Sequence, residues 1–207
     1  MWKDVTCIIL AGGASRRMGR DKAFIQIEGI RLLDYVYCKC RELFSEIIIV
    51  TNEPKQFDDY QTPVVPDEIP GIGSIGGLYT GLKHASSYYS FCVACDMPFL
   101  NPELIARLIE ERHTHDIVIP KTRAGFEPLH AVYAKRCIEP LKKYIEKGDL
   151  KISNLLAEVK VRYYSEEEIK KVDPALLSFM NVNTKKELFK IQQMVKGMPW
   201  TEKHEAC

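Results

Sequence analysis

The sequence predicts an α/β fold with a mostly parallel central sheet flanked by helices. Short apolar segments alternate with helix-like segments along most of the chain, and this order is typical of βαβ units. Several apolar segments contain almost no polar residues, as expected of parallel strands that are covered on both faces. With 207 residues, of which 46% are hydrophobic, the chain is long enough to bury the core that such a sheet requires.

Seven segments are predicted to be strands. Five are short, rich in β-branched or apolar residues and bounded by turn residues, and they lie at positions 5–10, 47–51, 64–65, 91–95 and 117–120. Two later segments, 127–133 and 160–164, have the same β-rich character. The first of these two is expected to lie outside the simple alternation of strand and helix.

Helices are predicted between and after these strands, at positions 31–44, 77–86, 102–112, 135–147 and 184–195. Asn101 is placed to cap the third helix, because a proline follows at the first helical position and an acid stands in the first turn. Gly148 is placed to end the fourth, and Asn183 or Thr184 to cap the last. No linker or repeat divides these elements, so we expect residues 1–196 to form one domain and 197–207 a polar tail that frays.

The stretch after the first strand is the strongest functional signal. Residues 10–22 read LAGGASRRMGRDK, in which an apolar strand runs into a glycine-rich, basic loop. Consecutive amides in such a loop form an anion-binding concavity, and Arg16, Arg17 and Lys22 add positive charge. The glycines have neither the Walker nor the Gly-x-Gly-x-x-Gly spacing. The loop is therefore predicted to bind nucleotide phosphates in another way, and an ordinary strand-to-helix turn is the alternative.

This loop resembles the signature of the molybdenum cofactor guanylyltransferases, a family of Rossmann-like nucleotidyltransferases, and the resemblance extends over about residues 5–194. It implies a three-layer fold of the nucleotide-diphospho-sugar transferase type. It also implies transfer of GMP from GTP to the terminal phosphate of molybdopterin, with Mg²⁺ as cofactor and pyrophosphate as the second product. The loop residues expected to bind the nucleotide are Leu10, Ala11, Gly12, Gly13 and Lys22, with Lys22 and Arg16 also taking part in catalysis.

Polar residues follow three other predicted strands, where open α/β sheets place their ligands. The sequence CDMPF around Asp96 matches the metal-aspartate motif of that family, which implies that Asp96 binds the nucleotide and holds Mg²⁺; a turn before the proline is the alternative. Asp67 resembles the nucleotide-contacting aspartate of the family, with a solvated turn as its alternative. Asn52 is equally a nucleotide ligand or a turn residue.

The expected acceptor side depends on later motifs. Residues 71–78 form a second glycine-rich segment that enters a helix and is suited to an anion; Ser74 departs from the family pattern, and a mobile surface loop is the alternative. His130 lies in EPLHAVY, which resembles the acceptor-side strand of the family, and FMNVNT matches a further family motif. A structural histidine and a helix cap are the alternatives. The acceptor candidates are Gly73, Gly77, His130, Asn181 and Asn183.

Composition limits the possible partners. The formal net charge is +1, which favours neither nucleic acid nor an anionic membrane. No run approaches the ~18 apolar residues of a membrane span, and the N-terminus lacks the pattern of a signal peptide, so we expect a cytoplasmic protein. GTP and molybdopterin are the expected substrates, and the resemblance also allows molybdoenzymes or other proteins of cofactor biosynthesis as partners.

Three other functions remain open at this stage. A CTP:molybdopterin cytidylyltransferase is the first, but relatives that use CTP tend to carry Leu-Ala-Ala-Gly where this chain has Gly12, which favours guanine. The second is another sugar-phosphate or alcohol-phosphate nucleotidyltransferase. The third is a non-catalytic GTP-binding chaperone that delivers the cofactor. Lys22 and Asp96 argue against the chaperone, because a protein that only binds nucleotide needs no metal at the α-phosphate.

Overall fold

A computed structural model describes residues 1–12 and 22–196 of the chain. The first half contains the strands β1 (Trp2–Leu10), β4 (Phe44–Thr51), β5 (Val64–Pro66) and β6 (Tyr89–Ala94), and the helices α1 (Leu32–Leu43), α2 (Ser74–His84) and α3 (Pro102–Glu110). A short hairpin of β2 (Gln26–Ile27) and β3 (Ile30–Arg31) precedes α1, and 3-10 turns lie at Lys22–Phe24, Pro54–Phe57 and Glu111–Thr114.

The second half adds four strands and three helices. The strands are β7 (Ile117–Thr122), β8 (Gly125–Phe126), β9 (His130–Ala134) and β10 (Val161–Ser165). The helices are α4 (Ile138–Glu146), α5 (Glu166–Lys170) and α6 (Lys185–Val195), with 3-10 turns at Lys135–Cys137, Ile152–Ala157 and Leu177–Phe179.

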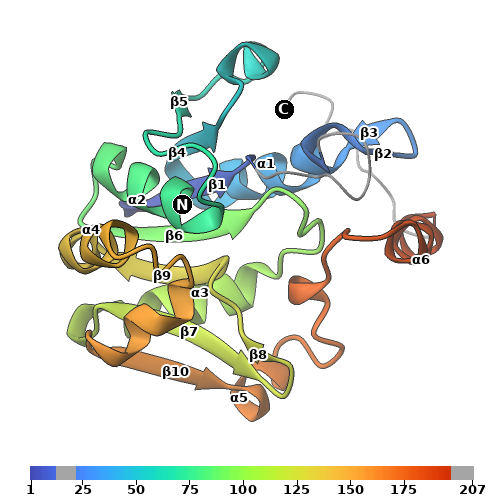
Figure 1. The fold of residues 1–207 in the computed structure, drawn as a ribbon. Coiled ribbons are helices and arrows are strands. Elements are labelled where there is room, and N and C mark those ends of the chain that lie inside the picture. The colour runs from blue at the N-terminus through green and yellow to red at the C-terminus, as the bar shows by residue number, and fades with distance from the viewer. Residues whose placement is uncertain (13–21, 197–207) are drawn as a thin grey trace.

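The main sheet has the order β10-β7-β9-β6-β1-β4-β5, with β8 paired to β7. All strands on this path run parallel except β9, which is antiparallel to both β6 and β7. Figure 1 shows β9 between β6 and β7 in the middle of the molecule. The predicted, mostly parallel α/β sheet is therefore confirmed, and the strand expected outside the simple alternation is the antiparallel one.

Helices cover both faces of the sheet and give the three predicted layers. On one face, α1, α3 and α5 enclose a core that contains Tyr37, Leu104 and Ile169. On the other face, α2 and α4 enclose a second core that contains Leu78 and Leu141. None of the helices in the described part of the chain has the length and apolar composition needed to cross a membrane.

Close packing of α2 on β1 explains two glycines of this helix. A Cβ atom at Gly77 would lie 3.2 Å from the Leu10 side chain, and one at Gly81 would overlap the side chain of Ile8. The two glycines are four residues apart and therefore share one face of the helix. They let α2 approach the sheet, which fixes the position of the loop that precedes the helix.

Most predicted elements are present with shifted boundaries. The predicted helix 77–86 begins three residues earlier, at Ser74, and the predicted strand 127–133 begins only at His130. Gly148 has a φ of +72° after α4 and Thr184 caps α6 by accepting a hydrogen bond from the amide of Glu187, both as predicted. The β2–β3 hairpin and α5 were not predicted, because each is too short to show a periodic pattern.

Candidate functional site

The carboxyl ends of the central strands meet at one edge of the sheet. The amide of Ala11 donates to the carbonyl of Val50 at 2.9 Å, and the amide of Cys95 donates to the carbonyl of Leu10 at 3.1 Å. These bonds join the segments that leave β1, β4 and β6. Asp96 therefore lies beside the exit of β1, as the parallel sheet predicted.

Lys22, Asp96 and Asn183 come together at this edge. The Lys22 Nζ atom donates to the Asp96 Oδ2 atom at 2.8 Å and also to the Asn183 Oδ1 atom. Asp96 is only 8% exposed, and a carboxylate buried to this degree needs a charged or hydrogen-bonding partner. The ammonium group provides one, and the contact joins three segments that are far apart in the sequence.

The segment before α6 completes this group. The amide of Val182 donates to the backbone carbonyl of Asp96 at 3.3 Å, so the segment 180–183 runs beside the aspartate. The Asn181 Oδ1 atom is buried and has no hydrogen-bond partner within residues 1–12 and 22–196. This oxygen could therefore accept a hydrogen bond or bind a cation.

These oxygens fit a small divalent cation. Mg²⁺ prefers oxygen ligands and is commonly held through one or two carboxylates together with substrate phosphates. Asp96 supplies a carboxylate, and Asn181 and Asn183 are the neighbouring residues with amide oxygens. Within the described residues, no group of three or more His, Cys, Asp or Glu side chains could hold a metal ion. A cation at Asp96 would therefore also need amide or substrate oxygens.

Gly12 and Asn52 lie next to each other, as their places after β1 and β4 predicted. A Cβ atom at Gly12 would lie 3.4 Å from both the backbone nitrogen and the side-chain Nδ2 of Asn52, which is ordinary contact. Gly12 does not have a positive φ angle, so its conformation alone does not require glycine. Leu10 and Ala11 are buried, whereas Gly12 and Asn52 are exposed and are placed to meet a ligand.

Asp67 has a partly structural environment. Its Oδ1 atom accepts hydrogen bonds from the amide of Ile69 at 3.1 Å and from the Thr80 hydroxyl at 3.0 Å. Its Oδ2 atom faces the first turn of α2, 3.1 Å from where a Cβ atom of Gly76 would lie. Thr80 is not among the predicted site residues, although a hydroxyl within the apolar stretch LYTGL of α2 was an available signal. The role of Asp67 as a nucleotide ligand stays a prediction.

Gly73 and Gly77 differ in what the structure gives them. Gly73 is exposed, has a φ of +78° and immediately precedes α2, so this position requires glycine and presents its backbone at the start of the helix. Gly77 is buried inside α2 against Leu10. Packing accounts for Gly77, which offers no surface to an acceptor.

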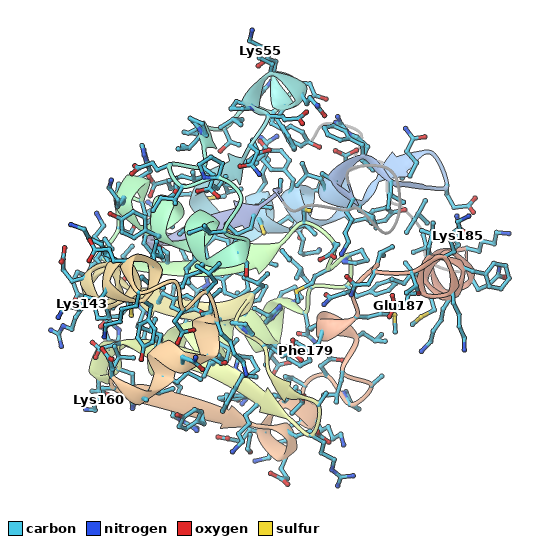
Figure 2. The ribbon with its side chains drawn as sticks, in the orientation of Figure 1. Lys55, Lys143, Lys160, Phe179, Lys185 and Glu187 are labelled. Atoms are coloured by element: carbon cyan, nitrogen blue, oxygen red, sulfur yellow. The ribbon has the colours of Figure 1, made fainter. Side chains whose placement is uncertain are left out.

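His130 is fully buried and does not reach the surface. Its ring meets the rings of Phe91 and Phe179 edge-on at centroid distances of 5.1 and 5.2 Å, and Figure 2 labels Phe179 in the segment that leads towards α6. Burial lowers the pKa of His130 to about 3, so the ring is neutral at physiological pH. This environment is that of a core histidine, the alternative considered for it, and does not suit an acceptor ligand.

Two predicted site residues, Gly13 and Arg16, lie outside the described residues. A cleft of about 520 Å³ lies between the N-terminus of α2, β8 and the turn that begins at Ile152. Its lining residues are Ser74, Ala124, Gly125, Phe126, Pro128, Leu150, Lys151, Ile152 and Ser153.

Comparison with known proteins gives consistent matches. Residues 7–163 match a family described as the MobA-like NTP transferase domain. The chain is 38% identical over 195 residues to a molybdenum cofactor guanylyltransferase from Desulfosudis oleivorans, covering 93% of this chain and 96% of that protein.

Solved structures agree with this match. The molybdopterin-guanine dinucleotide biosynthesis protein A from Archaeoglobus fulgidus superposes with a TM-score of 0.83 at 31% identity, covering 94% of this chain and all of that one. The same fold recurs at 14% identity and a TM-score of 0.64 in a Mycobacterium tuberculosis protein solved as a complex with manganese, covering 92% of this chain and 98% of that one.

Proposed function

The chain belongs to the MobA-like NTP transferase family, and from this premise we propose that it transfers GMP from GTP to the terminal phosphate of molybdopterin. The products are the guanine dinucleotide form of the cofactor and pyrophosphate. In this reaction an acceptor phosphate oxygen bonds to the α-phosphorus, and the bond from that phosphorus to the β-phosphate breaks. We propose that this reaction takes place in the cytoplasm.

One observation carries the proposal within the structure. Lys22, from the end of the glycine-rich loop, is bonded to Asp96 after β6 and to Asn183 before α6. The residues that we propose to bind phosphate, to hold the metal and to contact the acceptor are therefore in mutual contact. Nucleotidyl transfer needs all three at one point, because donor and acceptor react at the same phosphorus.

The residues of the site would act mainly by positioning and by charge. An acceptor phosphate is ionised near neutral pH, so no residue has to remove a proton from it. Lys22 would bind the triphosphate and offset the charge that develops on the leaving pyrophosphate. Gly12, Asn52 and Asp67 would hold the nucleotide at the ends of β1, β4 and β5, with Gly13 and Arg16 extending this set as predicted.

Asp96 would hold Mg²⁺ in the proposed reaction, and the amide oxygens of Asn181 and Asn183 stand beside it. The ion, when bound, would neutralise negative charge on the α-phosphate and the leaving group. Gly73, Asn181 and Asn183 remain the candidates for binding the acceptor. Gly77 and His130 are no longer candidates, because packing accounts for both.

Pyrophosphate release from purified protein tests this function. With molybdopterin and Mg²⁺ present, we expect release with GTP to exceed release with CTP, UTP or ATP. Faster release with CTP would identify a cytidylyltransferase instead. Tight GTP binding without pyrophosphate release would identify a non-catalytic carrier.

A further inference from the structure

Glu127 lies at the same edge of the sheet as Asp96, on the connection between β8 and β9. The amide of Ala94 donates to the carbonyl of Leu129 at 3.3 Å, and Val93 pairs with His130. This connection therefore runs beside the end of β6, from which the chain continues to Asp96. The immediate neighbours of Glu127, Phe126 and Pro128, both line the cleft of about 520 Å³.

The carboxyl group of Glu127 is half-buried and has no partner among residues 1–12 and 22–196. It has no hydrogen bond or ion pair with any residue in the described part of the chain, in contrast to Glu166 and Glu168, which both pair with basic side chains. Burial raises the pKa of Glu127 to about 7. A half-buried carboxylate without a partner is costly, and such a group beside a cleft suggests that a ligand supplies the missing partner.

The position of Glu127 indicates which ligand this is. The predicted nucleotide contacts Gly12, Asn52 and Asp67 follow β1, β4 and β5, whereas Glu127 precedes β9, on the opposite side of β6. A substrate that binds on this side is the acceptor. A carboxylate accepts hydrogen bonds and repels phosphate, so its partner is an N–H group.

We propose that Glu127 binds the acceptor by accepting hydrogen bonds from N–H groups of its fused pterin ring, and so positions the acceptor phosphate for attack. The inference rests on the proposed function, since that function supplies the pterin. The cleft beside Glu127 has the size of a small-molecule site; Phe126 and Pro128 line it, whereas Glu127 lies next to it and is not one of its lining residues. Guanine presents the same amino-pyrimidinone edge as a pterin, so the test must separate the two substrates.

Replacement Glu127→Gln changes this contact with little change in shape. The amide replaces one acceptor oxygen by an NH₂ group, which faces the N–H donors of the ring. We expect the KM for molybdopterin to rise tenfold or more, while kcat stays within threefold and the KM for GTP within twofold. Glu127→Asp keeps the charge on a shorter side chain, so its KM for molybdopterin should lie between those of the unmodified protein and Glu127→Gln. The matched control is Glu139→Gln, an exposed glutamate of α4, which should change none of these constants.

Equilibrium binding of molybdopterin without nucleotide gives a second measurement that does not depend on turnover. Weaker binding to the Glu127→Gln protein than to the unmodified protein, at a melting temperature no lower than that of the unmodified protein, supports the proposal. Equal binding, or a raised KM for GTP alone, overturns it, and the latter result would assign Glu127 to guanine. If the unmodified protein binds molybdopterin but releases no pyrophosphate, the proposed function fails and the binding comparison still decides the role of Glu127. If it binds no molybdopterin, both fail.

Discussion

Replacement of Lys22 by methionine tests the centre of the proposed site. The change keeps most of the side-chain volume and removes the ammonium group that bonds Asp96 at 2.8 Å. The Lys22 and Asp96 side chains are 23% and 11% exposed, so this pair lies between an exposed ion pair and a fully buried one. Breaking it should lower the free energy of unfolding by about 1–3 kcal/mol, between the small effects of surface pairs and the ~3–5 kcal/mol of buried ones.

Chemical denaturation of the ligand-free protein measures this effect. Lys39→Met is the matched control, because Lys39, which is 29% exposed, pairs at a similar distance of 2.7 Å with Glu42, whose side chain is 47% exposed. That variant should lose less than about 0.5 kcal/mol. The double mutant of Lys22→Met with Asp96→Asn should be more stable than the sum of the single changes predicts, because each change alone leaves the other residue of the pair without its partner.

Nucleotide binding gives the functional half of the test. A charged hydrogen bond to phosphate is worth about 1.5–3 kcal/mol, so the GTP dissociation constant of Lys22→Met should rise by roughly 10- to 150-fold. The reasoning is refuted if Lys22→Met and Lys39→Met are equally stable and bind GTP within twofold of the unmodified protein. Lys22 would then be an ordinary surface cation.

Four further predictions follow from single residues. Asp96→Asn should abolish pyrophosphate release at every Mg²⁺ concentration that saturates the unmodified protein, and an active but less stable variant would show that this carboxylate is only a cap. Gly12→Ala should fold, since the added Cβ atom makes ordinary contact with Asn52, and calorimetry should show that it weakens GTP more than CTP. His130→Met should be more resistant to acid unfolding, as measured by chemical denaturation at pH 5. The pKa of His130 is lowered in the folded protein, so below about pH 6.5 the unfolded chain binds a proton that the folded chain does not bind. This difference lowers the free energy of unfolding of the unmodified protein by about 2 kcal/mol at pH 5. Glu127→Gln should be more stable than the unmodified protein above pH 7 by about 1–3 kcal/mol, because the raised pKa removes stability as pH rises from about 4.5 to about 7; equal unfolding curves at pH 8 would contradict this.

The sequence alone determined the fold class and the edge of the sheet where the candidate site lies. Apolar runs such as residues 47–51 predict covered parallel strands without any knowledge of their neighbours. Parallel strands bring their carboxyl ends to one edge, so Gly12, Asn52 and Asp96 could be placed together from their positions after strands. The family resemblance then named the chemistry, because a motif records local residue identities that do not depend on packing.

Only the tertiary structure decided which side chains meet and which are enclosed. No local pattern links Lys22 to Asn183, since 161 positions separate them and the contact exists only because the segment before α6 packs beside Asp96. Gly77 and His130 sit within motifs that suggest ligand contacts, yet the first packs on Leu10 and the second lies between two aromatic rings. Burial is a property of the whole assembled core, so it is fixed by residues far away in the sequence and cannot be read from the neighbours of a single position.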